Sequence, residues 1–143
     1  MIIRGKPFGN NVYLEAEGAL GEDAGAKGLH SPMLFKVYRV STSSRIEVGC
    51  TSMAPLPGCC GVVVSFHTYL NALNRHTGLS EEFRKLKRTM AEELGYSLMI
   101  CTADMSNIPA VGNMLKSYKV VETFTNKRTG HLIGLGIAHI GNG

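Results

Sequence analysis

The segment from Arg75 to Ser80, which reads Arg-His-Thr-Gly-Leu-Ser, has the residue types and the position of a phosphate-binding loop. It follows an apolar run and precedes a basic stretch with helical spacing. The first backbone N–H groups of a helix have no intrahelical partner, so they can point toward a bound anion. Gly78 allows close approach to the backbone, and Arg75 supplies positive charge. The alternative is an ordinary connection with a glycine turn and with Ser80 as the helix cap.

A second group of residues has side chains that act as bases or nucleophiles in other proteins. His67 lies in the apolar run, and histidine titrates near neutral pH. Cys59, Cys60 and Cys101 would act as nucleophiles only beside a histidine and a group that orients it. No such arrangement is visible, so we predict a buried, hydrogen-bonded histidine and cysteines packed in the core. Cysteine and histidine spacings match no zinc pattern, so no metal site is predicted.

Length and composition indicate one globular domain spanning residues 1–143. The chain is 44% hydrophobic and 18% charged, with a formal net charge of +4. This charge is compatible with an anionic partner such as a nucleotide cofactor. The first residues lack the apolar segment of a signal peptide, and no apolar run approaches about 18 residues. We therefore expect a cytoplasmic protein that does not contact a membrane.

Four basic residues lie close together on the predicted helix that follows the loop: Arg84, Lys85, Lys87 and Arg88. They could contact a cofactor phosphate or a nucleic acid, but such runs more often form a solvated helix face. Aromatic residues that would stack on bases are not interleaved with them. A nucleic acid is therefore not the expected partner.

Hydrophobic periodicity predicts strands and helices that alternate along the chain. Strands are predicted at 33–40, 45–51, 59–69 and 96–102, and a hairpin at 120–125 and 131–140 with its turn at 126–130. The strand at 59–69 should be central, because it is apolar on both faces. Residues 1–28 show no period and are predicted to be rich in loops.

Two helices are predicted from spacing and capping residues. The first covers 80–94 and ends at Gly95, with an apolar stripe formed by Phe83, Leu86, Met90 and Leu94. The second is opened by Asn107-Ile-Pro109, with Asp104, Ser106 or Asn107 as its cap. Its predicted buried face consists of Val111, Met114, Leu115 and Tyr118. Gly134 and Gly136 share one face of the final strand, which indicates that a large side chain or another backbone packs over them.

The order helix, strand, helix and hairpin resembles the second half of the acetyl-CoA-dependent N-acyltransferases, the GNAT superfamily, over residues 59–140. In that family a central strand leads into a pyrophosphate-binding loop with the pattern R/Q-x-x-G-x-G/A. The segment from Arg75 to Ser80 matches it except that Ser80 replaces the final small residue.

A second family signature, N-x-x-A-x-x-L-Y-x-K-x-G-F, is partly present on the following helix. Asn107, Ala110 and Lys116 match it. The tyrosine that often protonates the leaving thiolate in the family corresponds to Met114, which has no proton to donate. Tyr118 lies one helical turn further on and is the candidate acid.

The resemblance implies an α/β (α+β) domain with a mixed, largely antiparallel sheet, flanking helices and an acetyl-CoA site. An amine would then attack the thioester directly. The edge of the strand containing Val64 and Phe66 would face the pantetheine arm. The pyrophosphate would be held by the loop and the start of the helix, and the implied cofactor-binding residues are Val64, Phe66, Arg75, His76, Thr77, Gly78, Leu79, Ser80 and Asn107.

The alternative to an enzyme is a non-catalytic structural or interaction protein on the same fold. Met114 in the tyrosine position favours this alternative, as does the lack of an amphipathic helix pattern in residues 1–58. Small acetyltransferase-like proteins encoded by phages, some of them virion components, show a similar degenerate character. Such a protein would bind a protein partner or a second copy of itself rather than acyl-CoA and an amine.

Overall fold

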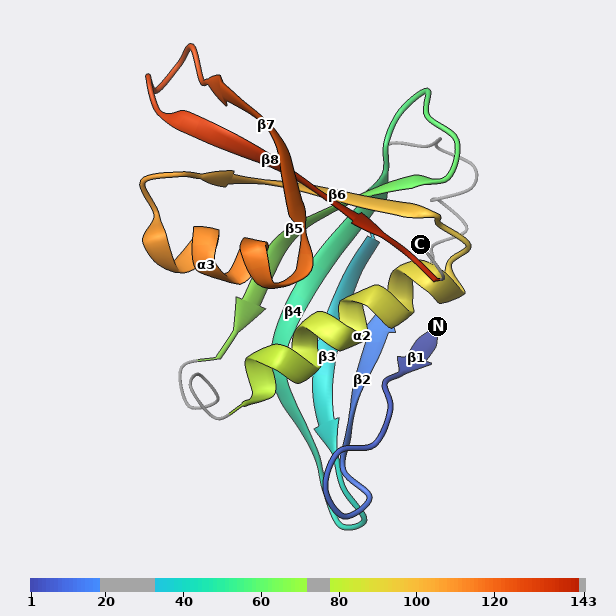
Figure 1. Ribbon diagram of the computed structural model, residues 1–143. Coiled ribbons are helices and arrows are strands. Elements are labelled where there is room, and N and C mark those ends of the chain that lie inside the picture. The colour runs from blue at the N-terminus through green and yellow to red at the C-terminus, as the bar shows by residue number, and fades with distance from the viewer. Residues whose placement is uncertain (19–32, 72–77, 142–143) are drawn as a thin grey trace.

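One eight-stranded sheet with two helices on the same face forms the body of the molecule (Figure 1). The computed structural model describes residues 1–18, 33–71 and 78–141. The elements, in chain order, are β1 (Ile2–Arg4), β2 (Tyr13–Gly18), β3 (Met33–Val40), β4 (Arg45–Pro55), β5 (Val62–Leu70), α2 (Leu79–Glu93), β6 (Leu98–Asp104), α3 (Ile108–Ser117), β7 (Lys119–Thr125) and β8 (Leu132–His139).

The strands lie in the order β1-β2-β3-β4-β5-β6-β8-β7. Neighbouring strands are antiparallel except β5 and β6, which are parallel and are connected through α2. A parallel pair needs such a crossover, because its second strand must start at the same end of the sheet as the first. This arrangement confirms the predicted α+β class and the mixed, largely antiparallel sheet.

The main core lies between α2 and the sheet. Phe83, Leu86 and Met90 are buried as their spacing predicted, and Leu94 packs against the edge of the cluster. Burying each such side chain stabilises the fold by about 1.5–3 kcal/mol. Gly95 follows the helix with φ 87°, as predicted for a left-handed cap.

The beginning of α2 differs from the prediction. Gly78, with φ 81°, occupies the N-cap position, and no side chain caps the helix. Ser80 is therefore already inside the first turn and is not the cap. A glycine suits this position because L-residues with a side chain rarely adopt a positive φ.

Residues 1–18 contain two strands, β1 and β2, in a part of the chain that was predicted to be rich in loops. The sequence of β2 lacks the alternation of apolar and polar residues that predicts a strand, because Leu14, Glu15 and Ala16 are buried in succession. Glu15 accepts hydrogen bonds from Arg4 at 3.1 Å and from Arg45 at 2.8 Å, so its carboxylate is buried with two cationic partners. Burial raises the pKa of Glu15, but these two partners outweigh it and the pKa is lowered. Residues 19–28 of the predicted loop lie outside the described residues.

The central strand begins later than predicted, at Val62. Cys59 and Cys60 lie in a turn between Gly58 and Gly61, which both have positive φ, and the two thiols are exposed. The prediction that these cysteines pack in the core is therefore wrong. The chain forms a turn here and not a strand, because the two glycines that flank the cysteine pair adopt positive φ.

Helix α3 is shorter than predicted and buries less of its surface. Asn107 caps it by accepting a hydrogen bond from the Ala110 amide at 3.3 Å. Met114 is buried, but Leu115 is 58% exposed, so the predicted four-residue buried face is wrong at this position. The helix ends at Ser117, and Tyr118 has extended backbone, with φ −126° and ψ 149°.

Gly134 and Gly136 lie under α3, as predicted for two glycines on one face. A Cβ at Gly136 would lie 2.9 Å from Tyr118 Cβ and 3.1 Å from Met114 Sδ. A Cβ at Gly134 would meet Met105 Sδ at 2.7 Å. The glycines therefore let α3 and the residue after it approach β8 closely.

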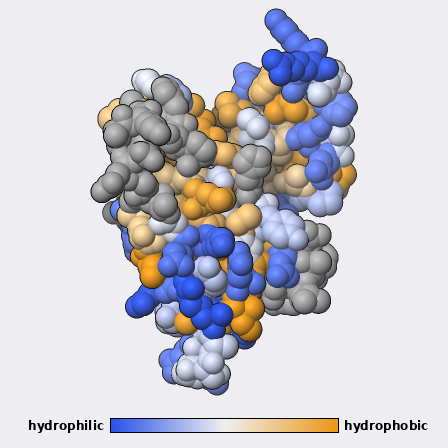
Figure 2. Space-filling model, turned by 180° about the vertical axis from the view of Figure 1, so that it is seen from behind, coloured by the Kyte–Doolittle hydropathy of each residue, from blue (hydrophilic) through white to orange (hydrophobic). Residues whose placement is uncertain are grey.

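The face of the sheet away from the helices is visible in Figure 2, where apolar residues gather across the middle of the view. Leu34, which alternates with buried Met33 and Phe35, is 58% exposed on this face. Among the described residues, no helix is long and apolar enough to cross a membrane.

We predict that Gly136→Ala lowers the free energy of unfolding by about 1–3 kcal/mol, because the added methyl group forces Tyr118 and Met114 away from β8. Gly112→Ala in α3 is the matched control, since a Cβ there meets nothing within 4 Å. The control should be neutral or up to about 1 kcal/mol more stable, because alanine is the better helix former. Urea unfolding of both variants tests this, and a Gly136→Ala variant as stable as wild type would contradict it.

Candidate functional site

The central feature of the site is the separation of β5 from β6. The two strands pair at Val62–Leu98, Val63–Met99 and Val64–Ile100, and the ladder then ends. Beyond this point β5 remains paired with β4, whereas β6 remains paired with β8. In Figure 1 the two strands run together at one end and diverge toward the left of the view.

An irregularity in β5 accompanies the separation. Cys50 pairs with Tyr69, but Ser52 pairs with Phe66, so β5 carries an extra residue opposite Thr51. Such a bulge bends its strand and increases the local twist. The bulge lies just beyond the last residue of β5 that pairs with β6, where the two strands must part.

A cavity of about 230 Å³ lies where the strands part. Its lining comes from β5, β6 and one residue of β8: Val64, Ser65, Phe66, Ile100, Cys101, Thr102 and Leu135. Val64 and Phe66, which were predicted to contact the cofactor, are both in this wall. Because Ser65 and Cys101 alternate with them, the cavity is bordered by residues of both sheet faces.

Two buried hydroxyl groups lie at this place without a well-formed hydrogen bond to any described residue. Within the described residues, neither Ser65 Oγ nor Tyr118 Oη completes a hydrogen bond of good geometry. The Ser65 side chain and the Cys101 thiol are nevertheless near enough to Tyr118 to shift its pKa. An unpaired buried polar group costs about 1–3 kcal/mol. Such groups are expected where a ligand supplies the missing partner.

Tyr118 is held in its protonated form. Burial, followed by the neighbouring Cys101 thiol, raises the pKa of this phenol well above its usual range. Burial also raises the pKa of Cys101, although the Lys87 ammonium acts in the opposite direction. At neutral pH both groups therefore carry their protons.

Lys87 extends from α2 toward the same region. Its Nζ donates a hydrogen bond to Thr68 Oγ1 at 2.7 Å, and Thr68 lies 3.3 Å from Thr51 Oγ1. The residue is half-buried, and no carboxylate among the described residues forms an ion pair with it. Burial lowers the pKa of Lys87 to about 8, against a smaller opposing effect of Cys101.

The basic run of α2 is thus not a uniformly solvated face. Lys85 is exposed and pairs with Glu82, in agreement with the prediction. Lys87 turns inward, and Arg88 donates from its guanidinium to the His139 backbone carbonyl of β8. The prediction of a solvated position is therefore wrong for the half-buried Lys87, whereas Arg88 is exposed as predicted.

The predicted phosphate-binding residues are only partly placed. Gly78, Leu79 and Ser80 form the beginning of α2, whose first N–H groups have no intrahelical partner. Glu81 and Glu82 follow in the first turn and reduce the positive potential there. Arg75, His76 and Thr77 lie outside the described residues. Asn107, the remaining predicted cofactor residue, uses its side-chain oxygen to cap α3.

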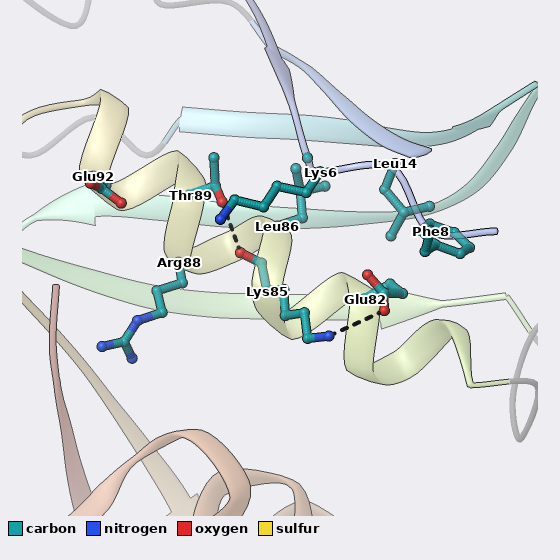
Figure 3. Close-up of a pocket in the computed structure, with 10 residues that line it drawn as sticks. Lys6, Phe8, Leu14, Glu82, Lys85, Leu86, Arg88, Thr89 and Glu92 are labelled. Carbon is teal, nitrogen blue, oxygen red and sulfur yellow. Dashed lines mark hydrogen bonds and ion pairs between the residues drawn. The ribbon is translucent and has the colours of Figure 1, made fainter. Parts of the chain in front are cut away.

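A second cavity, of about 250 Å³, lies between the segment after β1 and the outer side of α2 (Figure 3). Lys6, Lys85 and Arg88 line it together with Glu82 and Glu92. Charges of both signs give it no preference for an anion, and Figure 3 shows the Arg88 side chain pointing away from Lys6. The cavity between β5 and β6 is therefore the better candidate site.

Solved structures with a similar arrangement include acetyltransferases. A GNAT-family acetyltransferase from Elizabethkingia anophelis, with acetyl-CoA bound, has a TM-score of 0.65 and is 10% identical, over 92% of this chain and 100% of its own. A GNAT-family acetyltransferase from Bacillus anthracis has a TM-score of 0.59 at 16% identity, over 74% of this chain and 65% of its own. The ribosomal-protein-S18-alanine N-acetyltransferase of Escherichia coli has a TM-score of 0.58 at 8% identity, over 83% of this chain and 76% of its own.

The chain has the GNAT fold. The resemblance inferred from residues 59–140 is thus confirmed at the level of architecture, and the similarity to the Elizabethkingia anophelis protein covers 92% of this chain. No protein-family model matches the sequence, and no curated protein sequence matches it either. At identities of 8–17% the GNAT fold is established by shape alone, so substrate and activity depend on the site.

Sequence reasoning missed Lys87 and Ser65 as site residues. Lys87 follows Phe83 by four residues and precedes Met90 by three, which places it beside the apolar stripe and signals an inward direction. Ser65 is the polar residue within Val62–Phe66, an apolar run that had been predicted to be buried on both faces. The spacing of Lys87 and the polar type of Ser65 were visible in the sequence. Each is also found at positions that have only a structural role.

We predict that the stability of the wild-type protein rises relative to Lys87→Met between about pH 8 and pH 10. In the unfolded chain the lysine pKa is near 10.4, so the unfolded state binds more protons than the folded state across this window. Stability must then increase with pH. Thermal unfolding at pH 7 and pH 10 measures the change in the difference in Tm. Lys85→Met, at an exposed position of the same helix, is the matched control, and a difference in Tm that is the same at pH 7 and pH 10 for Lys87→Met would contradict the prediction.

Proposed function

We propose that this protein is an acetyl-CoA-dependent N-acyltransferase that transfers an acyl group to an amine. The observation that carries the proposal is the cavity formed where β5 and β6 part, with two unpaired buried hydroxyls beside it. The same fold is seen with acetyl-CoA bound in the Elizabethkingia anophelis protein, which supports this choice of ligand.

The residues of the site divide into an anion-binding part and a thioester-binding part. Gly78, Leu79 and Ser80 at the start of α2 would bind the pyrophosphate through backbone N–H groups, aided by Arg75, His76 and Thr77. Val64 and Phe66 would position the pantetheine arm along the cavity wall. Asn107 would act indirectly, by fixing the start of α3. Acyl-CoA supplies an activated acyl group, and the cavity would hold it in one orientation for the amine.

Tyr118 would supply the proton that the leaving thiolate needs. Burial keeps its phenol protonated, and its Oη completes no hydrogen bond of good geometry among the described residues, although Ser65 and Cys101 lie near it. A donor with only such weak contacts is available to a group that becomes negative during the reaction. Met114, at the usual tyrosine position, is instead buried against Gly136.

The same Met114 supports the second candidate function, a non-catalytic protein that interacts through this fold. A thioether cannot donate a proton, and its packing against Gly134 and Gly136 is a sufficient structural reason for its presence. Under this alternative the cavity would bind no acyl-CoA. The cytoplasmic location and the phage origin stay predictions.

Calorimetric titration with acetyl-CoA tests the proposal. We expect micromolar binding by the wild-type protein and at least tenfold weaker binding by Gly78→Glu, because the added carboxylate lies where the phosphates would bind. Gly78→Asn is the matched control, since asparagine tolerates the left-handed backbone and adds no charge. It should bind within about threefold of wild type.

One result of this titration would reject the transferase proposal, and another would reject the proposed phosphate site. One is the absence of binding heat at high micromolar acetyl-CoA, from folded protein shown to be free of copurified coenzyme A. The other is equal affinity of wild type and Gly78→Glu, which would place the phosphates elsewhere.

A further inference from the structure

Lys87 brings a primary amine to the place where β5 and β6 separate. Its Nζ is fixed on β5 by the 2.7 Å hydrogen bond to Thr68, beyond the end of the β5–β6 ladder. The Lys87 amine is also close enough to the Cys101 thiol of β6 for each group to shift the pKa of the other. Cys101 in turn lines the cavity. The amine thus lies beside the cavity in which the proposed function places a thioester.

The surroundings of Lys87 make its neutral form more accessible than in an exposed lysine. Among the described residues, the titratable group that acts on Lys87 is the Cys101 thiol on β6, which in turn lies near Tyr118. Burial raises the pKa of both Cys101 and Tyr118, so neither contributes a negative charge at neutral pH. Because the half-buried ammonium has no anionic partner among the described residues, its pKa is lowered to about 8, and roughly a tenth of Lys87 is uncharged and nucleophilic at pH 7.

The Thr68 contact also orients the amine. A neutral amine can donate one N–H to Thr68 Oγ1 and still keep its lone pair for a nucleophilic attack. An exposed lysine such as Lys85 has no fixed direction of this kind and instead pairs with Glu82 at 3.4 Å. The two lysines lie on the same helix, so they form a matched pair for comparison.

We propose that Lys87 is an acylation site of this protein, at which its Nζ accepts an acyl group from a thioester bound between β5 and β6. The nitrogen attacks the carbonyl carbon, a C–N bond forms, and the C–S bond breaks with its electron pair leaving on sulfur. The proton that the nitrogen loses passes to the thiolate. The products are an Nε-acyl-lysine and a free thiol, with no oxidant or reductant needed.

Acylation would change the site in a defined way. It removes the positive charge of Lys87 and leaves one amide N–H in place of the ammonium donors. The added acyl group would occupy space beside Cys101. The modified protein would therefore bind a second thioester less well. When the acyl donor is abundant, acylation of Lys87 would thus reduce the binding of further donor in the cavity.

The test is site-resolved mass spectrometry after incubation with two donors, acetyl-CoA and S-acetyl-N-acetylcysteamine, a thioester that has no phosphate. With both donors we expect an acetyl group, a gain of about 42 Da, on Lys87 at least ten times faster than on Lys85. The rate should fall about tenfold per pH unit below pH 8, because only the neutral amine attacks. Lys87→Arg should lose the fast labelling, whereas Lys85→Arg should retain it.

The two donors separate this inference, which for acetyl-CoA rests on the proposed function, from that function itself. Fast labelling of Lys87 by the small thioester but not by acetyl-CoA would support the reactive amine and reject the coenzyme A site. Labelling of Lys87 no faster than Lys85 by either donor, from protein with the wild-type circular dichroism spectrum, would overturn the inference. So would fast labelling at the same total rate in Lys87→Arg.

Discussion

The structure depends most on one constraint, which is that β5 and β6 are parallel neighbours for a short distance only. Their ladder stops at Val64 and Ile100, while each strand continues with its other partner. A continuous sheet would satisfy more backbone groups, so the separation must be stabilised by the elements around it. The β4–β5 ladder with its bulge holds one side of the separation, and the β6–β8–β7 unit with α3 holds the other.

The packing of α3 shows how the second side is held. Gly134 and Gly136 remove two side chains from β8, which lets Met114 and Tyr118 pack directly on the strand. The same close approach buries the Tyr118 hydroxyl near Cys101 and Ser65. Tight packing and an unsatisfied polar cluster therefore arise from the same contacts. The packing of the α2 core must offset the unfavourable free energy of these hydroxyl groups and of the half-buried Lys87 cation.

The sequence predicted the parts of the fold that depend on local pattern. The stripe of α2, its glycine end and the glycine pair of β8 all follow from spacing within a few residues. The cleft could not be predicted in this way, because it arises where two strands more than 30 residues apart stop pairing. The N-terminal strands were missed because Glu15 is buried with Arg4 and Arg45, and Arg45 is supplied by a distant strand.

The candidate site shows the same division. Val64 and Phe66 were predicted from the strand that carries them, and they line the cavity. Lys87 was predicted to be a solvated residue, because its inward direction depends on Thr68 in another element. Tyr118 was expected on a helix, but α3 ends one residue earlier, and its extended backbone aims the side chain over Gly136.

Hydrogen–deuterium exchange with and without saturating coenzyme A tests the central claim, that the gap between β5 and β6 is the ligand site. We predict slower exchange in peptides that cover Val62–Leu70, Leu98–Asp104 and the start of α2, with no change in Met33–Val40. Slower exchange confined to segments away from β5 and β6, or no change anywhere, would contradict it.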